Sequence, residues 1–381
     1  MRTGFFGGAF DPFHNEHKSI VECAKNELNL DKVVVYPSFA PPHKNCTAPY
    51  EARRELAETA LKQCGYVVID DVEKERDADK NPTCEVLPLL KKKYAAEENY
   101  FIIGGDSMFN FSKWIKPEIV AKTMKIAVVA RENVEEVERK AEEARKNYGA
   151  DVTVLNYVGK AVSGSLVKAK IEFGEKPDEI DEKVYEKIIE KGLYREHKDV
   201  VEKLKNNIPE RTFEHVKRTV YYAFKLNVKL GLPYEKVFLA AGLHDCAKHL
   251  HRAMDGVPPA VEHQFLGAEV AENEYGVKDE DVLNAIKYHT TGKPDMTTLE
   301  KLVFCADMLE EGRSYPGVTE LRKTIENDFE KGFVECVNSS MKKLIEDGKP
   351  FHFLTKECAM YYNHRREEKI NDGDTNESAR T

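Results

Sequence analysis

Apolar and polar residues follow two different patterns along the chain. In the first half, short apolar runs such as "KVVVYP" (32–37) and "KIAVVA" (125–130) are separated by amphipathic stretches. Runs that are apolar at successive positions are typical of strands buried on both faces of a parallel sheet. The predicted strands are 2–6, 32–37, 66–70, 100–104, 124–130 and 151–155, with helices such as 51–62 and 134–147 between them. This alternation predicts an α/β Rossmann-like domain with helices on both faces of the sheet.

After about residue 194 the strand-like runs end and helical periodicity takes over. The predicted helices are 212–230, 233–249, 261–275, 280–289, 298–311 and 318–346. This pattern predicts an all-α bundle. We therefore expect an α/β domain at 1–196 and an all-α domain at 197–365. The segment 366–381 has almost no apolar residues and is predicted to be disordered.

Composition narrows the classes of partner. The 381 residues carry a formal net charge of -9, which disfavours non-specific binding to nucleic acid or to an anionic membrane. Apolar runs stay far below the ~20 residues that span a bilayer, and the N-terminus does not have the pattern of a secretory signal. The eight cysteines form no CxxC pair. We therefore expect reduced thiols and a cytoplasmic protein.

The first chemical constellation is "GGAFDPFHNEHKSI" at 7–20. Gly7 and Gly8 follow the first predicted strand, where ligands bind in open α/β sheets. Without Cβ atoms, they would let a phosphate approach backbone N–H groups. His14 and His17 are three residues apart at the start of a predicted helix, whose N-terminal dipole favours anions. The stretch predicts a polyphosphate site, with an ordinary strand-to-helix turn as the alternative.

This stretch resembles the GGxFDPxHxGH signature of the nucleotidyltransferases that adenylylate mononucleotides. Further segments resemble the bacterial nicotinate-nucleotide adenylyltransferase branch, in the same order along the chain. They are "PPHK" (41–44), "GGDSM" (104–108) followed by Trp114, "VSGSLVK" (162–168) and "GLY" (192–194). The resemblance covers residues 1–195. It implies adenylyl transfer from Mg²⁺-bound ATP to nicotinate mononucleotide, with release of pyrophosphate.

The resemblance also implies roles for individual residues. His14 and His17 would stabilise the triphosphate. Trp114 would stack on the nicotinate ring, and Thr83 would help to recognise the nicotinate carboxylate. The other implied nucleotide contacts are Gly7, Gly8, Lys44, Gly105, Asp106, Arg131, Ser163, Ser165 and Lys168. Taken alone, Trp114 could equally be a core residue, and Lys44 and Arg131 could be solvated surface cations.

Several positions depart from the pattern of that branch. Glu16 replaces the glycine of HxGH, and it could point inward, outward or towards a bound Mg²⁺. Gly164 replaces a serine, and Lys168 replaces an arginine, keeping the charge but not the bidentate geometry. In "NPTCEV" (81–86), Pro82 and Glu85 replace a tyrosine and an aspartate. These differences leave open a degenerate nucleotide sensor as the alternative.

A second constellation lies in the helical half. Imidazoles and carboxylates recur on separate predicted helices, and the adjacent pair His244 and Asp245 follows the apolar run "LAAGL" (239–243). The candidate ligands are His215, His244, Asp245, His263, His289 and Asp307. Such side chains converging in a bundle form buried metal sites. Nitrogen and oxygen ligands without thiolates suit iron or manganese at least as well as zinc.

The order H…HD…D resembles the HD-domain phosphohydrolases. Over 205–365, "HDCAK" and "KYHTTGKPDMTTLEKLVFCADMLEEGR" are similar to the bacterial symmetrical bis(5'-nucleosyl)-tetraphosphatases, although Gly312 stands where a proline is usual. This resemblance implies two metal ions bridged by Asp245, one held by His215, His244 and Asp307 and the other by His263 and His289. Lys248 and Arg313 would neutralise the substrate phosphates.

The activity implied is the cleavage of diadenosine tetraphosphate into two ADP. The alternatives are another nucleotide phosphate as substrate, or a scaffold in which both sites are inactive. The number of chains in the assembly is open, with a homodimer among the options.

Overall fold

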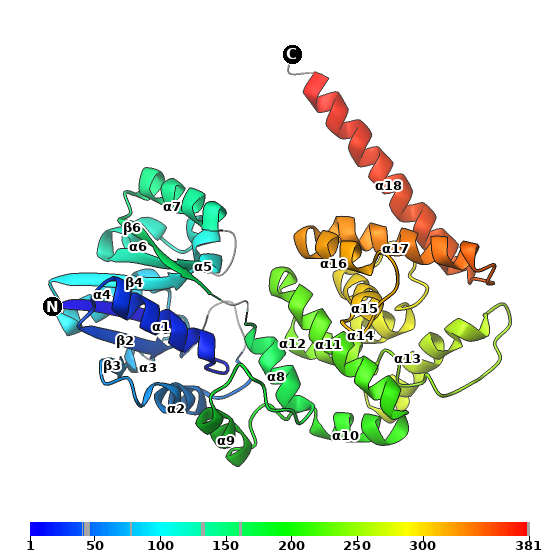
Figure 1. The fold of residues 1–381 in the computed structure, drawn as a ribbon, viewed down its shortest axis with the longest axis horizontal. Coiled ribbons are helices and arrows are strands. Elements are labelled where there is room, and N and C mark those ends of the chain that lie inside the picture. The colour runs from blue at the N-terminus through cyan, green and yellow to red at the C-terminus, as the bar shows by residue number, and fades with distance from the viewer. Residues whose placement is uncertain (40, 42–45, 77, 131–133, 160–161, 379–381) are drawn as a thin grey trace. The chain divides into compact units, whose positions relative to one another are not determined.

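The computed structural model describes residues 1–39, 41, 46–76, 78–130, 134–159 and 162–378. The chain divides into two compact units, Met1–Arg195 and Glu196–Thr381 (Figure 1). The first unit is α/β and the second is helical, so the predicted fold class is confirmed.

A six-stranded parallel sheet forms the centre of the first unit, in the order β3-β2-β1-β4-β5-β6. The strands are β1 (Arg2–Gly8), β2 (Lys32–Pro37), β3 (Val67–Ile69), β4 (Glu98–Gly104), β5 (Lys125–Ala130) and β6 (Val152–Val158). All six were predicted, with bounds that differ by a few residues. The chain reverses its direction of winding between β1 and β4, which are neighbours. The crevice beyond the carboxyl ends of these two strands is where ligands bind in such sheets.

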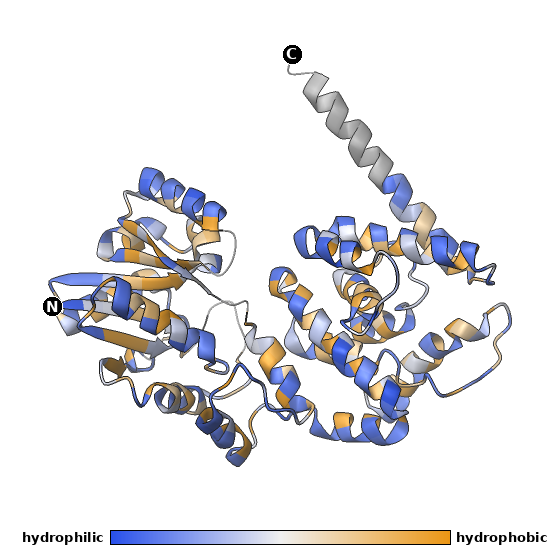
Figure 2. Ribbon diagram, in the orientation of Figure 1, coloured by the Kyte–Doolittle hydropathy of each residue, from blue (hydrophilic) through white to orange (hydrophobic). Residues whose placement is uncertain are grey.

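Helices cover both faces of the sheet, and each face has its own apolar core. On one face, α1 (Asn15–Glu27) and α2 (Tyr50–Leu61) pack against strand residues such as Val33 and Val35. On the other, α4 (Thr83–Tyr94), α6 (Pro117–Thr123) and α7 (Val134–Tyr148) pack against residues such as Phe5 and Val34. Figure 2 shows the apolar strands between helices whose outer sides are hydrophilic.

The remaining helices of this unit are α3 (Val72–Glu75), α5 (Gly105–Phe109), the short 3₁₀ helix η1 (Phe111–Lys113), α8 (Gly164–Glu172) and α9 (Glu182–Glu190). A third apolar cluster joins α2, α8 and α9, through Leu56, Val167 and Ile188 among others. It anchors the segment that bears the predicted serine motif.

The second unit consists of α10 (Lys198–Asn207), α11 (Glu210–Leu230), α12 (Tyr234–Leu243), the 3₁₀ helix η2 (Pro259–Val261), α13 (Glu262–Glu274), α14 (Glu280–Lys287), α15 (Thr298–Leu309), α16 (Val318–Asn327), α17 (Phe329–Glu346) and α18 (Phe353–Ser378). Helices α11, α12, α14 and α15 pack against one another, and α13 packs on α14. The predicted metal ligands lie within or directly after α11–α15.

Two helix predictions in this unit were wrong in extent. The predicted helix 318–346 is two helices, because Asp328 caps the second by accepting a hydrogen bond from the Lys331 N–H at 3.0 Å. A Cβ at Gly332 would lie 2.3 Å from Ile325 Cα, so the two helices meet at a glycine. The predicted helix 233–249 ends at Leu243, and turns follow. Helix α18 continues into 366–378, and the disorder of the tail stays a prediction.

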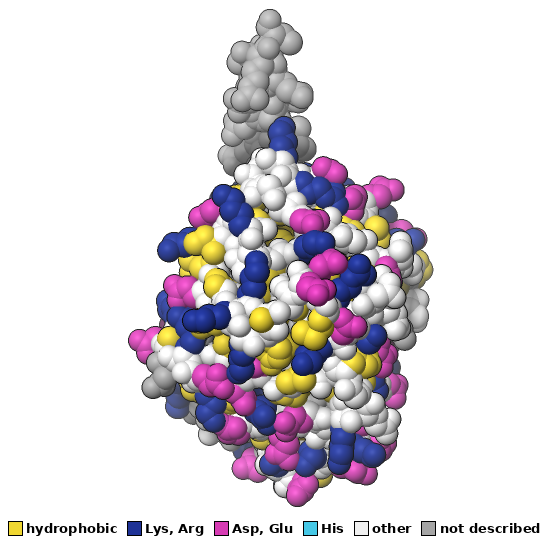
Figure 3. Space-filling view, turned by 90° about the vertical axis from the view of Figure 1, so that its left-hand side faces the viewer, with side chains coloured by type: hydrophobic (Ala, Val, Ile, Leu, Met, Phe, Trp, Pro, Cys, Tyr) yellow, Lys and Arg dark blue, Asp and Glu magenta, His cyan; other side chains and the backbone are white. Residues whose placement is uncertain are grey.

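In the described part of the chain, no helix has both the length and the apolar character needed to cross a membrane. On the face shown in Figure 3, Lys and Arg side chains lie among Asp and Glu side chains, with small hydrophobic areas between them. The two signs of charge are therefore intermixed on that face.

Candidate active sites

A cavity of about 360 Å³ lies at the crevice between β1 and β4 in the first unit. Its walls come from the ends of both strands and of β2, from α1, α3, the start of α4 and α5, and from the segment after α5. The predicted site residues that line it are Gly7, Gly8, His17, Thr83, Asp106 and Trp114. His14, Gly105, Ser163, Ser165 and Lys168 are not among its lining residues, and Lys44 and Arg131 lie outside the described residues. The structure therefore brings together about half of the predicted nucleotide contacts.

The two glycines of the first turn are explained by aromatic packing. A Cβ at Gly7 would lie 2.4 Å from the ring of Tyr36, and a Cβ at Gly8 would lie 2.7 Å from the ring of Phe10. Both distances are far below van der Waals contact. The space beside these two rings is thus one reason for glycine at both positions, and the predicted close approach of a phosphate stays a prediction.

The two histidines of this segment stack at the start of α1. Their ring centroids are 3.6 Å apart with an interplanar angle of 15°, and the His14 N–H donates to His17 Nδ1 at 3.2 Å. His14 is buried, whereas His17 is half-buried and reaches the cavity. Because Nδ1 of His17 accepts a hydrogen bond, the ring carries its proton on Nε2. It therefore offers an N–H donor, as an anionic ligand requires.

Glu16 lies away from the cavity. Its side chain is buried, and the Tyr157 hydroxyl donates to Glu16 Oε2 at 3.4 Å from the end of β6. The residue is not among those that line the cavity. Of the orientations left open by the sequence, the structure therefore excludes both an exposed Glu16 and one that lines the cavity.

Lys168, a predicted phosphate contact, forms a buried ion pair in this structure. Its side chain is buried, with Nζ 3.1 Å from Asp11 Oδ2 and 2.7 Å from Thr47 Oγ1. Burial tends to raise the pKa of Asp11, but Lys168 and the N–H groups of Thr47 and Ala48 outweigh it, so that the pKa lies below its usual value. A Cβ at Gly164 would lie 3.0 Å from the Asp11 carbonyl oxygen, which leaves little room for a serine. The segment around Lys168 is thus tied to the first turn by a buried ion pair.

The polar residues of the cavity wall that sequence reasoning missed include Glu73 and Asn81. Glu73 is buried on α3, and burial raises its pKa to about 7, although the Phe39 N–H donates to its carboxylate at 3.0 Å. Asn81 is only 5% exposed, and within the described residues neither atom of its amide group has a hydrogen-bond partner. Both lie in a highly charged stretch, 71–81, that has the composition of a surface loop. Nothing in that pattern indicated a binding pocket.

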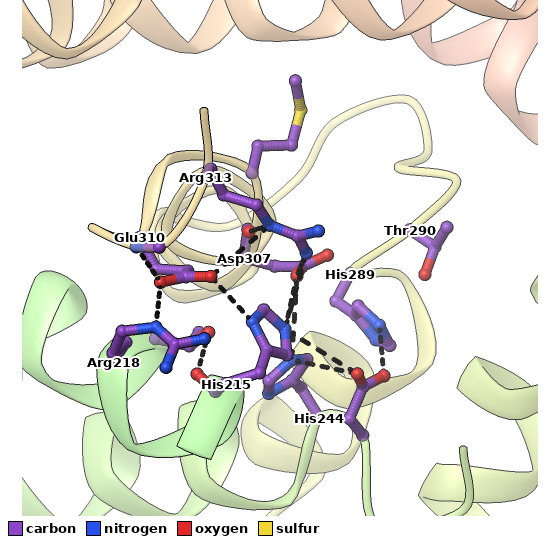
Figure 4. A network of polar contacts seen from close by, with 12 residues as sticks. His215, Arg218, His244, His289, Thr290, Asp307, Glu310 and Arg313 are labelled. Carbon is purple, nitrogen blue, oxygen red and sulfur yellow. Dashed lines mark hydrogen bonds and ion pairs between the residues drawn. The ribbon is translucent and has the colours of Figure 1, made fainter. Parts of the chain in front are cut away.

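All six predicted metal ligands converge in the second unit. Figure 4 labels His215, His244, His289 and Asp307 among them. The potential ligand atoms form two groups, and within each group all atoms lie within 4.8 Å of one another. One group is His215, His244 and Asp307, and the other is His244, Asp245 and His289. His263 joins the second group, because its Nε2 lies 3.2 Å from His289 Nε2 and 3.3 Å from Asp245 Oδ1. The carboxylate of Asp245 lies between the two groups. Its Oδ2 faces His215 and His244 at 3.8 and 3.7 Å, while its Oδ1 faces His263 and His289.

The orientation of the imidazoles suits a cation. Nδ1 of His244 donates to the Ala241 carbonyl at 2.7 Å, and Nδ1 of His289 donates to the Ile286 carbonyl at 2.8 Å. Their Nε2 lone pairs therefore point into the cluster. There His244 Nε2 lies 3.3 Å from His215 Nε2. Imidazole nitrogens and carboxylate oxygens that converge at such distances are a donor set that suits a metal ion.

His215 is the most strongly paired histidine of the cluster. Its Nε2 lies 2.9 Å from Asp307 Oδ1 and its Nδ1 lies 3.1 Å from Glu310 Oε1. Burial lowers the pKa of His215, but the hydrogen bonds to Asp307 and Glu310 outweigh it and raise the pKa to about 9. By contrast, burial is the main cause that lowers the pKa of His244 to about 4 and that of His263 to about 3. Glu310, which sequence reasoning missed, thus holds the predicted ligand His215 by its Nδ1, on the side of the ring opposite Nε2.

Two cations border the cluster, as predicted. Arg313 Nη2 lies 2.6 Å from Asp307 Oδ1, and Lys248 Nζ lies 3.3 Å from Asp245 Oδ1 and 3.0 Å from His263 Nε2. Thr290 Oγ1 is also 3.2 Å from His263 Nε2. The arrangement can hold cations between its imidazoles and carboxylates and can place positive side chains beside a bound phosphate.

Comparison with known families assigns both units. Residues 5–170 match the model of the cytidylyltransferase-like family, and residues 212–312 match that of the HD domain. A probable nicotinate-nucleotide adenylyltransferase of Clostridium tetani is 31% identical over 199 residues, which are 51% of this chain and 99% of that protein. A symmetrical bis(5'-nucleosyl)-tetraphosphatase of Bacillus subtilis is 33% identical over 161 residues, which are 39% of this chain and 87% of that protein.

One relative matches both units together. A Mycoplasma genitalium protein named probable nicotinate-nucleotide adenylyltransferase/Ap4A hydrolase is 24% identical over 324 residues, which are 81% of this chain and 87% of that protein. The order of the two families is therefore the same in both chains. The chain belongs in its first part to the nicotinate-nucleotide adenylyltransferase branch of the cytidylyltransferase-like family and in its second part to the HD-domain hydrolases related to the symmetrical bis(5'-nucleosyl)-tetraphosphatases.

Proposed function

We propose that the chain is a bifunctional enzyme with an adenylyltransferase at 1–196 and a phosphohydrolase at 197–365. The first would transfer the adenylyl group of ATP to nicotinate mononucleotide, and the second would cleave diadenosine tetraphosphate into two ADP. The observation that carries the proposal is the convergence of all six predicted ligands in the second unit, together with the cavity at the strand crevice of the first.

In the adenylyl transfer, the phosphate of the mononucleotide attacks the α-phosphorus of ATP and pyrophosphate leaves. No protein nucleophile is needed, so the protein contributes positioning and charge stabilisation. The Nε2–H of His17 would donate to a phosphate oxygen, with His14 stacked behind it to fix the ring. Trp114, in the cavity wall, would stack on the pyridine ring. Mg²⁺ bound with ATP would neutralise part of the triphosphate charge.

In the hydrolysis, the six ligands would hold two transition-metal ions, with iron and manganese the best candidates for a set without thiolates. When bound, such ions position a phosphate and lower the pKa of a water molecule. The protein's own part is to orient each imidazole by fixing Nδ1, and to offer Asp245 to both groups. Arg313 and Lys248 would neutralise the phosphates next to the cluster.

The test for the first unit is pyrophosphate release from Mg-ATP with nicotinate or nicotinamide mononucleotide. We expect turnover with both reactants present and a preference for the nicotinate form. If neither mononucleotide supports release, the second candidate replaces the first: a nucleotide sensor, which is favoured by the burial of Lys168 against Asp11 and by the absence of Ser163 and Ser165 from the cavity wall.

The test for the second unit is product analysis after incubation with diadenosine tetraphosphate and either Fe²⁺ or Mn²⁺. We expect ADP alone as the product, and no turnover after chelation. AMP together with ATP would contradict symmetrical cleavage, while turnover that survives chelation would contradict the metal site.

A further inference from the structure

The two halves of the ligand cluster have different surroundings. We define the Asp307 group as His215, His244 and Asp307, and the His263 group as His263 and His289. Asp245 faces both groups, with Oδ2 towards the first and Oδ1 towards the second. Asp307 gives its own group a carboxylate, whereas the His263 group has only the shared oxygen of Asp245.

The Asp307 group is backed by a buried anion. Glu310 is 2% exposed and lies 3.1 Å from His215 Nδ1. It is fixed by Arg218 Nε and by the Gly312 N–H, both at 2.6 Å (Figure 4). A carboxylate on Nδ1 makes the opposite ring nitrogen a stronger ligand, and loss of such a partner typically weakens metal binding by ~10–100-fold.

Gly312 makes this arrangement possible. A Cβ at that position would lie 2.6 Å from Arg218 Nε, which is the atom that holds Glu310. The residue that departs from the usual sequence of the branch thus provides the space for the guanidinium group. Arg313 also borders this group: its Nη2 lies 2.6 Å from Asp307 Oδ1 and 3.5 Å from His215 Nε2, and its Nε donates to the Asp307 backbone carbonyl at 2.9 Å. In the Asp307 group the buried carboxylate of Glu310 offsets this positive charge.

In the His263 group a cation contacts the ligand atoms, and no buried carboxylate among the contacts described backs the imidazoles there. The ammonium of Lys248 lies 3.0 Å from His263 Nε2 and 3.3 Å from Asp245 Oδ1, two of the atoms that would bind a metal there. The partner of His289 Nδ1 is neutral, because the Ile286 carbonyl accepts its hydrogen bond at 2.8 Å, and Thr290 Oγ1 adds a neutral contact to His263 Nε2 at 3.2 Å. The Lys248 side chain is 45% exposed, so it has free space on its solvent side.

We propose that the two metal positions are unequal: the Asp307 group binds its ion tightly, whereas Lys248 occupies the His263 group as a resident counter-cation that a second metal ion must displace. The inference rests on the metal site of the proposed hydrolase. Lys248 would thus act in metal binding first, and would contact a substrate phosphate only after the second metal ion has bound. The displaced ammonium remains next to the cluster, where a substrate phosphate can pair with it.

The experiment is a titration of the metal-stripped full-length chain with Mn²⁺ alone, in which free Mn²⁺ is counted by electron paramagnetic resonance. The wild type should bind two ions in two steps that differ at least tenfold in affinity. Lys248→Met should tighten the weak step at least tenfold and leave the tight step unchanged. Glu310→Gln should weaken the tight step ~10–100-fold. Lys278→Met and Glu311→Gln, at exposed positions away from the ligands, are the matched controls.

Lys248→Arg keeps a cation and should keep the second step weak, so a general effect of substitution is distinguished from the loss of charge. Two equal steps in the wild type, or a weak step that Lys248→Met leaves unchanged, would overturn the inference while the metal centre stands. Failure of the wild type to bind any Mn²⁺ or Fe²⁺ would overturn both the inference and the proposed hydrolase site.

Discussion

The buried carboxyl of Glu73 makes the stability of the first unit depend on pH. Its pKa is raised from 4.5 to about 7, chiefly by burial, so the folded unit holds a proton that the unfolded chain releases between these two values. An acid whose pKa is raised on folding stabilises the folded state fully below pH 4.5, and this stabilisation is lost as the pH rises through 7. Glu73→Gln removes the titration and keeps an oxygen that can accept from the Phe39 N–H.

The magnitude follows from the size of the shift. A shift of about 2.5 units at 1.36 kcal/mol per unit corresponds to about 3 kcal/mol. At pH 8 the variant should therefore be more stable than the wild type by up to about 3 kcal/mol, and at pH 4.5 the two should be nearly equal.

The assay is urea unfolding at both pH values, followed by tryptophan fluorescence. Trp114 is the only tryptophan and packs, half-buried, against the core of the first unit, so the signal reports that unit alone. Glu75→Gln, at a position on the same helix whose side chain is 62% exposed, is the control and should show no such difference. The reasoning would be refuted if wild type and Glu73→Gln were equally stable at pH 8, or if their stabilities differed by the same amount at both pH values.

Three further substitutions test other parts of the account. Gly332→Ala places a Cβ 2.3 Å from Ile325 Cα and should lower the free energy of unfolding of the second unit by ~1–3 kcal/mol, seen by circular dichroism without a shift of the Trp114 transition. Lys168→Met leaves Asp11 buried without its cation and should lower the free energy of unfolding in urea by ~3–5 kcal/mol. The double variant with Asp11→Asn should recover part of this loss. If Lys168→Met does not change the stability, the buried ion pair is contradicted. Asn81→Ala removes a buried amide from the cavity wall and should weaken mononucleotide binding about tenfold in a Trp114 fluorescence titration, with ATP binding unchanged; equal losses for both ligands would exclude a specific contact.

The fold followed from the sequence because its signals are local. The continuous apolar runs predicted all six strands, and the change to helical periodicity near residue 194 placed the second unit in the right class. The break at Asp328 was missed, because the apolar periodicity continues across it and only the capping side chain and Gly332 mark it.

The sites were partly predictable. The ligand cluster was predictable because buried imidazoles and carboxylates on separate helices need partners, and a metal ion is a common one. The structure brings all six predicted ligands together. The sequence did not reveal the ion pair between Lys168 and Asp11, because a position in a motif does not show which partner a buried side chain has. Glu73, Asn81 and Glu310 carry no local signal: each lies among other charged or polar residues, and only the folded chain shows which of them is buried.

The central claim is that one chain carries two separate catalytic centres, and the most direct test measures both reactions on the same two variants. Asp245→Ala should abolish hydrolysis of diadenosine tetraphosphate and leave adenylyl transfer at the wild-type rate. His17→Ala should slow adenylyl transfer at least ~10-fold, as loss of a charge-stabilising donor does, and leave hydrolysis unchanged. Loss of both activities in either properly folded variant, or survival of hydrolysis in Asp245→Ala, would contradict the account.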